Sequence, residues 1–479
     1  MERNVVQWMA WLGLACAPVA HAEDPIDVDL LLRDDARLVR WVEGHSPAVK
    51  ANGHRVAEAV ARVGQASVLQ NPQLGVDLAN IPLGATNPEG LAFKELAVVR
   101  VGLSQTFELG KRGPRTDAAQ ARLEATRWRG KAVLLNEVTR ARLALADVVA
   151  GELRRRAVEE ALSVARGLVG RIEARIAEVR KKRTELEPAA SKGRPPKRAR
   201  RTTDPPVEDD ATLTRAEAAA KDDAARAVAL VLELEARLAS LDGALATARS
   251  RCAIVLRAPC AGGGTAAALE QAAPIGTDAH DVRALVASRP DIEALRQDRV
   301  AAEQTATLVR RRLWPDPTVT VSYAHSRATI AGDQANTLLV GLSFPIPAID
   351  YGQHDRVRWE QRTAALGAQV DAAIEDGRAT ARVLTEERSG LERVRERLER
   401  LLPKAAALRD AALGRSETSA DVLSATRLVV TATLELADTR HRLFEVRNAL
   451  RVVLGLDRPA KAEAPAAPPP AKLVKEPRD

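Results

Sequence analysis

Histidine and cysteine, which most often bind metals or carry out nucleophilic and acid–base chemistry, are few in this sequence and are not spaced for it. No His-x-x-x-His or Cys-x-x-Cys pair marks a metal site. There is no glycine-rich phosphate loop, no nucleophile elbow and no Ser, His and Asp set of a hydrolase. The histidines are His21, His45, His54, His280, His325, His354 and His441. We therefore expect no enzyme, no structural metal site and no cofactor, and energy for function must come from a partner.

The composition favours long helices. The chain has 479 residues, of which 46% are hydrophobic, 28% charged and only 3% aromatic. Ala, Leu, Arg and Glu are abundant, and these residues lose little on entering a helix. The net charge is +8, from 72 Lys and Arg against 64 Asp and Glu. Neither a strongly basic nucleic-acid binder nor a multi-span helical membrane protein fits, because beyond the N-terminus no run of about 18 apolar residues occurs.

The N-terminus predicts export. An apolar run from Val5 to Val19 is followed by Ala20-His21-Ala22, which offers small residues to a signal peptidase. We expect residues 1–22 to be a signal peptide. A second interpretation remains open, since Leu14-Ala15-Cys16 is similar to a lipoprotein cleavage box and would place a lipid anchor on Cys16.

Two cysteines remain after such cleavage. Cys252 and Cys260 lie where a helical pattern ends, just before Gly262-Gly263-Gly264. Export to an oxidising compartment allows a short disulfide that closes this corner. Two buried thiols are the other interpretation, and the spacing fits both.

The chain repeats itself once. Four segments recur at offsets of 243, 245, 239 and 198 positions, and a near-constant offset over unlike segments indicates two homologous halves. The matched segments are 45–49 with 288–292, 71–74 with 316–319, 101–104 with 340–343, and 249–256 with 447–454. The smaller last offset gives the first half roughly 40 extra residues, between its strands and its end.

Each half predicts a helix, two strands and two very long helices. Apolar residues alternate in the first strand of each pair, and residues 96–107 and 337–346 form the second. In an exported protein, such strands suit a barrel wall with one face to lipid. Four strands cannot close a barrel, and open edges are not tolerated in lipid. Either several protomers share one barrel or the strands are not transmembrane.

The long helices carry seams with a 3.5-residue period, which is typical of coiled coils. From about Arg115 to Lys182 the first helix would span roughly 100 Å at 1.5 Å per residue. The seams predict two antiparallel hairpins that form a rod. Their residues are Leu162, Ala165, Val169, Ile172, Ile176 and Val179; Ala227 to Val255; Leu391, Val394, Leu398, Leu401, Ala405, Leu408 and Ala412; and Val422 to Val453.

Paired strands, long hairpins and twofold repetition together resemble the TolC-like outer-membrane efflux proteins, over about residues 30–456. The segment Leu103 to Arg112 is similar to that family's strand-to-helix turn, at Gly110, Lys111 and Arg112, and is closest to members that serve heavy-metal efflux. Ser288 to Asp291 is also typical.

The resemblance implies a mainly α fold with a small β part. Three protomers would share one 12-stranded β-barrel in the outer membrane and its lipid, and the hairpins would continue as a periplasmic tunnel. The homotrimer would passively conduct heavy-metal cations or drugs that a periplasmic adaptor and an inner-membrane pump deliver, without nucleic acid as a partner. A channel for type I protein secretion is an alternative with the same fold. A periplasmic coiled-coil scaffold without a pore is a second, although it has no use for the paired strands.

The resemblance also implies where function lies. The second hairpin tip, which would dock the adaptor, includes Gly414, Arg415, Ser416, Glu417 and Thr418. Asp421 matches an acidic position that rings the periplasmic aperture in some members, while Ser424 stands where those members have a second acid. Three carboxylates could filter cations. Alternatively, Asp421 caps a helix beginning at Val422.

The predicted organisation departs from the family at the first hairpin tip. The first repeat, 23–257, contains a basic, Pro-rich insertion at 183–211, interpreted as a solvated loop or as a docking element for an unusual adaptor. A linker at 258–280 joins it to the second repeat, 281–456. The Pro- and Ala-rich segment 457–479 is a tail without a core.

Overall fold

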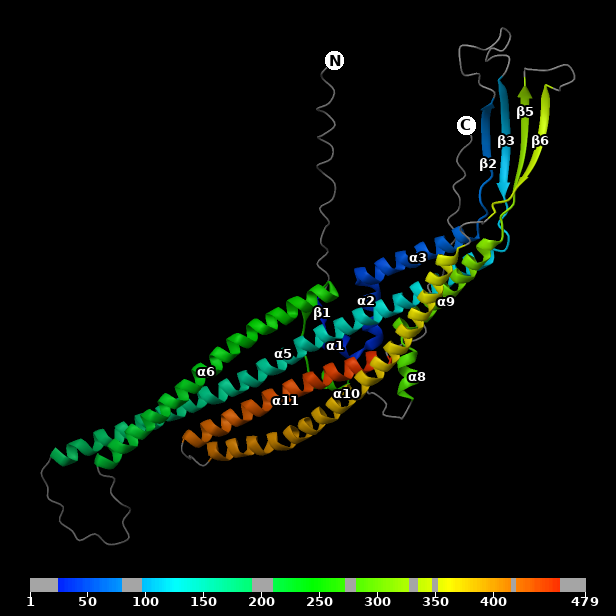
Figure 1. The fold of residues 1–479 in the computed structure, drawn as a ribbon. Helices are drawn as coiled ribbons and strands as arrows, with labels where there is room; N and C mark the ends of the chain where they lie inside the picture. Colours follow the sequence, from blue (N-terminus) through cyan, green and yellow to red (C-terminus); the bar gives the residue numbers. More distant parts are fainter. Residues whose placement is uncertain are drawn as a thin grey trace, which may run out of the picture.

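The computed structural model describes residues 25–79, 97–191, 210–271, 281–326, 335–346, 352–414 and 419–456. They form an elongated molecule in which a small sheet stands at one end of a long bundle of helices (Figure 1). Residues 1–22, which we expect to be a signal peptide, lie outside these ranges, as do most of the basic insertion and the segment 457–479, so what the sequence predicts for them stays a prediction.

The predicted repeat is present as two runs of the same elements. The first run is helix α3 (Pro47–Ser67), strands β2 (Gln73–Ala79) and β3 (Val98–Thr106), and helices α5 (Arg112–Ser191) and α6 (Asp210–Leu256). The second run is α9 (Pro290–Arg310), β5 (Thr318–Ser326), β6 (Asn336–Ser343), α10 (Gln353–Gly414) and α11 (Ser419–Val453). The order of elements read from the sequence is confirmed.

The four long strands form one antiparallel sheet in the order β2-β3-β5-β6. The two inner strands come from different repeats, and Val101 of β3 lies opposite Tyr323 of β5. The sheet therefore joins the two halves of the chain, which local pattern alone does not predict.

The helices form two antiparallel hairpins that lie side by side, and the first reaches further from the sheet (Figure 1). Helix α5 has 80 residues and α6 has 47, against 62 for α10 and 35 for α11. At 1.5 Å per residue, α5 is about 120 Å long. None of the helices described in this structure contains an apolar stretch of the length that a membrane-spanning helix requires.

The predicted bounds of the first hairpin are wrong at its far end. Helix α5 continues to Ser191 and α6 begins at Asp210, so the loop assigned to 183–211 is partly helical. The physical reason is that Leu213 and Ala220 stay buried and extend the seam of α6 toward the tip. Most of the extra residues in the first half therefore lengthen its two helices.

The seam between α5 and α6 is confirmed. Leu162, Ala165 and Ile172 of α5 are buried in one cluster with Ala227 and Leu234 of α6. A period of 3.5 residues keeps these side chains on the facing sides of both helices.

The seam predicted for α10 is wrong in part. Ala405 and Ala412 are buried, but Val394, Leu401 and Leu408 are exposed, Leu408 by 63%. Ion pairs across the hairpin hold α10 to α11 instead. They are Glu387–Arg442 at 2.8 Å, Glu392–Arg447 at 3.0 Å and Glu399–Arg440 at 3.0 Å. The single chain thus leaves an apolar stripe of α10 uncovered.

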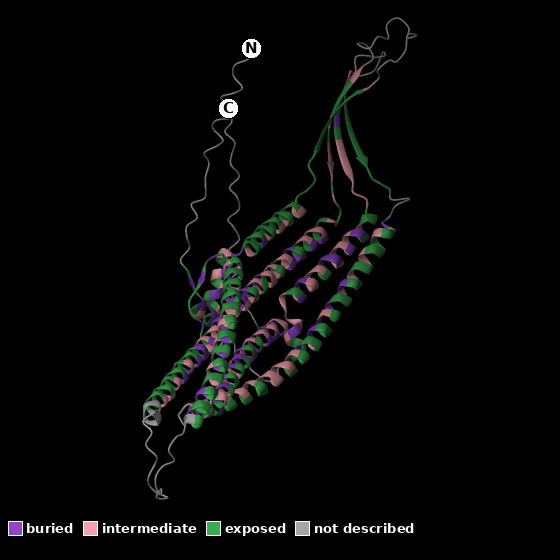
Figure 2. Ribbon diagram, turned by 90° about the vertical axis from the view of Figure 1, so that its left-hand side faces the viewer, coloured by how far each residue is buried: buried purple, intermediate pink, exposed green. Residues whose placement is uncertain are grey.

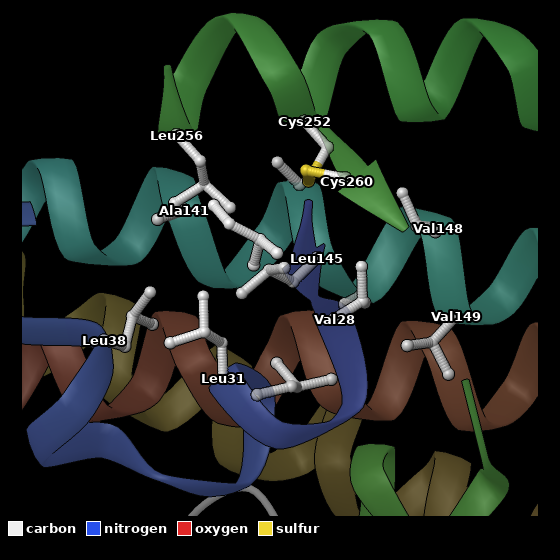
Figure 3. Packing of buried hydrophobic residues seen from close by; sticks show 14 of the residues in the cluster. Val28, Leu31, Leu38, Ala141, Leu145, Val148, Val149, Cys252, Leu256 and Cys260 are labelled. Atoms are coloured by element: carbon white, nitrogen blue, oxygen red, sulfur yellow. A yellow bond between two sulfur atoms is a disulfide. The ribbon is translucent and has the colours of Figure 1, made fainter. Parts of the chain in front are cut away.

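A core in the middle of the molecule holds the N-terminal elements against α5. Val28 and Leu31 pack in one cluster with Leu145 and Val149 of α5 (Figure 3). The short elements are β1 (Ile26–Asp27), α1 (Val28–Arg33), α2 (Asp35–His45), β4 (Cys260–Ala261), α7 (Ala266–Gln271) and α8 (Val282–Ala287). Burial of their apolar residues fixes the start of the described chain to the longest helix.

The same core contains the two cysteines. Cys252 and Cys260 are joined by a disulfide, and Cys260 also lies opposite Ile26 in the β1–β4 pair (Figure 3). The segment 258–280 is not a plain linker, because its described part includes β4 and α7, with Ala268 and Leu269 buried.

Two ion pairs of Asp35 tie α2 to both long hairpins. One oxygen of Asp35 lies 3.1 Å from Arg142 of α5, and the other lies 3.1 Å from Arg451 of α11. The Arg142 side chain is only 5% exposed and also donates to Asn448. A buried guanidinium needs such acceptors, so Asp35 holds the three helices together.

Candidate functional site

One face of the four-stranded sheet is apolar and exposed. The register aligns Leu74, Leu103, Val321 and Val340 in a row across all four strands, and Val340 is 73% exposed. Figure 2 shows the buried residues gathered in the helical part, while β2 and β6 are exposed. The face consists of Leu74, Val76, Leu78, Val99, Val101, Leu103, Val319, Val321, Tyr323, Leu338, Val340 and Leu342.

The opposite face is mostly polar. Asp77 and Arg100 lie opposite each other in neighbouring strands. The other polar residues of this face are Gln73, Ser104, Thr106, Thr318, Thr320, Ser322, Ser326, Thr337 and Ser343. A sheet with one apolar and one polar face matches the wall of a membrane barrel, in which lipid and water lie on opposite sides.

Both edges of the sheet are open. In the described ranges, β2 and β6 each pair with one strand only. Unpaired edge groups are a template for another chain in water and are very costly in lipid. The described sheet therefore has two free edges at which a further strand can pair.

The apolar face is bounded at both ends by residues suited to an interface. At the end near the inter-strand loops, Tyr323 donates to Asn336 over 2.5 Å, and His325 Nδ1 lies 2.9 Å from the same amide oxygen. At the other end, Phe107 and Phe344 are exposed directly after β3 and β6. Aromatic rings with a polar tip or neighbour typically mark the edges of a lipid layer.

The predicted strand-to-helix turn stands at the foot of β3. Gly110 has a φ of +68°, and a Cβ there would lie 2.9 Å from the Trp314 ring, so only glycine fits. Lys111 pairs with Asp316 at 2.7 Å, and the same carboxylate accepts from the backbone of Leu109. Helix α5 begins at Arg112. The turn thus fastens the first repeat to the start of β5.

The second repeat has an equivalent turn that the sequence reading missed. Gly352 has a φ of +78° directly before α10, and Arg312 pairs with Asp355 in the first turn of that helix. The internal repeat was the signal available, since Gly110 and Gly352 each precede the long helix of their half.

Asp421 is exposed at the start of α11. The alternative that it caps a helix beginning at Val422 is wrong, because α11 begins at Ser419 and Asp421 is its third residue. A carboxylate in the first turn still favours the helix through its dipole. Helix α10 ends at Gly414, and Arg415, Ser416, Glu417 and Thr418 lie outside the described residues.

A buried carboxylate that the sequence reading missed closes the first hairpin near its tip. Glu217 receives Lys221 at 2.9 Å, Arg180 at 3.0 Å and Arg183 at 3.6 Å. Hydrogen bonds from Lys221 and Arg180 lower the pKa of Glu217 to about 2. Its position between Leu213 and Ala220 in the seam was a signal, since a polar residue among apolar seam residues sets the register of a coiled coil.

Polar contacts also join the second hairpin to the first. They run from α11 to α5 and α6, on the side where the two hairpins face each other. The pairs are Asp147–His441 at 2.9 Å, Arg154–Asp438 at 2.5 Å and Glu233–Arg427 at 3.0 Å. Such partly exposed pairs are individually weak, so they position α11 without locking it.

A groove of about 660 Å³ lies between α3, α5 and α9. One of its ion pairs joins Arg129 to Asp298, and burial raises the pKa of the Asp298 carboxyl. Three arginines and three carboxylates line the groove, so its charge is balanced. Nowhere in the described part of the chain do three His, Cys, Asp or Glu residues gather as metal ligands.

Comparison with solved structures identifies the class of fold. The chain is similar to the outer membrane protein VceC of Vibrio cholerae, with 18% identity over 88% of this chain and 96% of that one, and a TM-score of 0.61. It is similar to the open state of the outer membrane channel MtrE of Neisseria gonorrhoeae, with 16% identity, 88% and 89% coverage and a TM-score of 0.59. It is also similar to CusC, a protein described as forming a transmembrane channel. The identity is 15% over 88% of this chain and 91% of that one, and the TM-score is 0.59.

The chain thus has the fold of these outer-membrane channels, and the TolC-like fold predicted from the sequence is confirmed. No protein-family model and no curated protein matches the sequence.

Proposed function

We propose that this protein is the outer-membrane channel of a tripartite efflux system and works as a homotrimer. The observation that carries the proposal is the four-stranded sheet, with one apolar exposed face and two open edges, placed at the end of long helical hairpins. The shared fold with outer-membrane channels supports it.

Three copies of the sheet would close one barrel of 12 strands. Strands β3 and β5 have nine residues each, which matches the 9–11 residues of a tilted membrane-spanning strand. The apolar face would contact lipid, and the polar face with Asp77 and Arg100 would line a water-filled lumen. Closure pairs β2 of one protomer with β6 of the next and removes both edges.

The helices would continue the barrel as a tunnel. The exposed stripe of Val394, Leu401 and Leu408 repeats every seven residues on α10, the spacing of a helix that packs against a neighbour. The next protomer is the occupant that fits, since it would lie beside this flank in a closed ring. The tunnel requires no chemistry of its own, so an adaptor and an inner-membrane pump would supply substrate and energy.

The far ends of the hairpins would contact the adaptor, at Gly414 to Thr418. Three Asp421 carboxylates would ring the aperture there and bind cations. Heavy-metal cations or drugs are the proposed cargo, and the periplasmic part would extend from the turns at Gly110 and Gly352 to these tips.

A channel for type I protein secretion is the second candidate with this fold. A scaffold without a pore is disfavoured, because it would expose the apolar face of the sheet to water at a high cost.

The test is the mass and the conductance of the detergent-purified protein. We expect three chains per particle and ion conduction across a planar bilayer. Leu401→Gln should weaken the trimer, whereas Arg400→Gln, one residue away and off the stripe, should not. A stable monomer that stays soluble without detergent would overturn the proposal. Loss of drug or metal efflux in a deletion strain, with protein secretion intact, would separate the two channel types.

A further inference from the structure

Three consecutive arginines stand where α9 ends and β5 is about to begin: Arg310 is the last residue of α9, and Arg311 and Arg312 open the short 3-10 helix Arg311–Leu313. Arg311 donates to the backbone carbonyl of Gly110, at the first strand-to-helix turn. Arg312 pairs with Asp355, at the second turn. Residues 310–312 therefore lie between the two strand-to-helix turns and connect the turn at Gly110 with the turn at Gly352.

Large apolar side chains are exposed at the same level. They follow β3 and β6 or precede β5, so they continue the apolar face beyond the strands. They are Leu109, Phe107, Phe344, Leu313, Trp314 and Ile346, from 45% to 84% exposed. We call segments 107–116, 310–317 and 352–360, together with Phe344 and Ile346, the collar.

The collar is basic. Its three segments contain eight Lys and Arg residues against four carboxylates, a net charge of +4. Every carboxylate has a basic partner within the collar. The pairs are Glu108–Arg115, Asp316–Lys111, Asp355–Arg312, and Glu360 with both Arg310 and Arg356.

Three cations remain without a carboxylate among the described residues: Arg112, Arg311 and Arg358. Arg311 lies over the Trp314 ring at 5.9 Å, and Arg358 over Trp359 at 5.5 Å. Guanidinium groups held beside aromatic rings are less hydrated than an ammonium and bind phosphate through two parallel hydrogen bonds.

We infer that the collar binds the phosphate headgroups of phospholipids and prefers anionic phospholipids. The inference rests on the proposed function, which places the apolar face of the sheet in lipid. The collar then lies at the depth of the headgroups on the side of the helices. Its aromatic and aliphatic side chains would contact the upper acyl chains, and the three arginines without a described carboxylate partner would contact the phosphates.

A free anion fits this surface less well than a lipid does. The exposed Leu313, Trp314 and Ile346 give an apolar neighbour that an inorganic phosphate cannot use, whereas an acyl chain can. A trimer would carry three such collars.

The test compares lipids retained by the purified trimer. The full-length protein is reconstituted into vesicles of phosphatidylcholine alone or of phosphatidylcholine mixed with phosphatidylglycerol. Native mass spectrometry then counts each bound lipid. We expect the wild type to retain phosphatidylglycerol preferentially, with about a fivefold loss of preference for each arginine removed.

The test variant is Arg112→Gln with Arg311→Gln and Arg358→Gln. A matched control removes three exposed arginines of α5 and α6 that lie far from the sheet, through Arg171→Gln, Arg175→Gln and Arg237→Gln. If the triple variant does not assemble, Arg112→Gln with Arg358→Gln leaves the Arg311 bond to Gly110 intact.

Loss of preference in the collar variant alone supports the inference. Equal retention of both lipids by a conducting wild-type trimer would contradict lipid binding by the collar, while the proposed channel function would remain supported. Complete displacement of phosphatidylglycerol by inorganic phosphate at constant ionic strength also overturns it, in favour of free anions. Failure to insert into either vesicle overturns the proposed function and the collar together.

Discussion

Placing one charge on either face of β6 tests the orientation of the sheet in lipid. Val340 and Leu339 are consecutive, so their side chains point to opposite faces of the sheet. Val340 shares its row with Leu74, Leu103 and Val321, and apolar side chains continue along β6 on both sides of it. Val340 is therefore expected near the middle of the lipid layer.

Val340→Lys should strongly destabilise the barrel. A lysine on the lipid face near the midplane costs about 2–4 kcal/mol, and three copies in one barrel give roughly 6–12 kcal/mol per trimer. Leu339→Lys, the matched control, adds the same charge on the lumen side, where water solvates it. We expect that variant to insert with nearly wild-type stability.

The assay is urea titration of trimers reconstituted in vesicles, with the folded fraction read from heat-modifiable migration on gels. The midpoint should fall sharply for Val340→Lys and little for Leu339→Lys. If Leu339→Lys were the more harmful change, the apolar face would not be the lipid face, and the reasoning would be refuted.

Four further predictions follow from the helical part. Asp35→Ala should lower the free energy of unfolding by about 2 kcal/mol in denaturant titration, because the buried Arg142 guanidinium loses one of its acceptors; an unchanged midpoint would show that Asp35 does not hold α2 to the two hairpins. The pKa of Glu217 is lowered to about 2, so its contribution is complete above a pH of about 4.5 and is lost as the pH falls toward 2. Glu217→Gln should remove this part of the acid dependence of thermal unfolding, and identical pH profiles would refute it. Replacing Cys252 and Cys260 together by Ala should cost about 2–3 kcal/mol in denaturant titration for a cross-link between residues eight apart, and equal stability would argue against the bond. Asp421→Asn should weaken block by trivalent cations in single-channel recordings on the order of tenfold, and unchanged block would end the proposal of an aperture ring.

Local periodicity in the sequence determined the elements and their order. Apolar residues alternate at Leu74, Val76 and Leu78, and they recur every seven residues along α6. These patterns involve neighbouring residues only, so they can be read without knowing how the rest of the chain folds. The repeat then fixed the second half from the first. The sequence also predicted only four strands, too few to close a barrel, and this number points to several protomers.

Tertiary structure decided which apolar stripe each helix buries. Helix α10 carries more than one apolar row, and the sequence could not show that ion pairs to α11 leave Val394, Leu401 and Leu408 exposed. The helices α5 and α6 also extend into the basic insertion 183–211, to Ser191 and from Asp210. This extension is visible only when the two helices are seen packed against each other.

Contacts between distant residues were likewise invisible in the sequence. Lys111 meets Asp316, and Asp35 meets both Arg142 and Arg451, across more than a hundred positions. The spacing of the cysteines allowed a disulfide or two thiols, and only the packing of β4 against β1 brings them into one buried corner. The physical reason is that pattern reports which face of an element is apolar, whereas the partner of that face depends on how the whole chain closes.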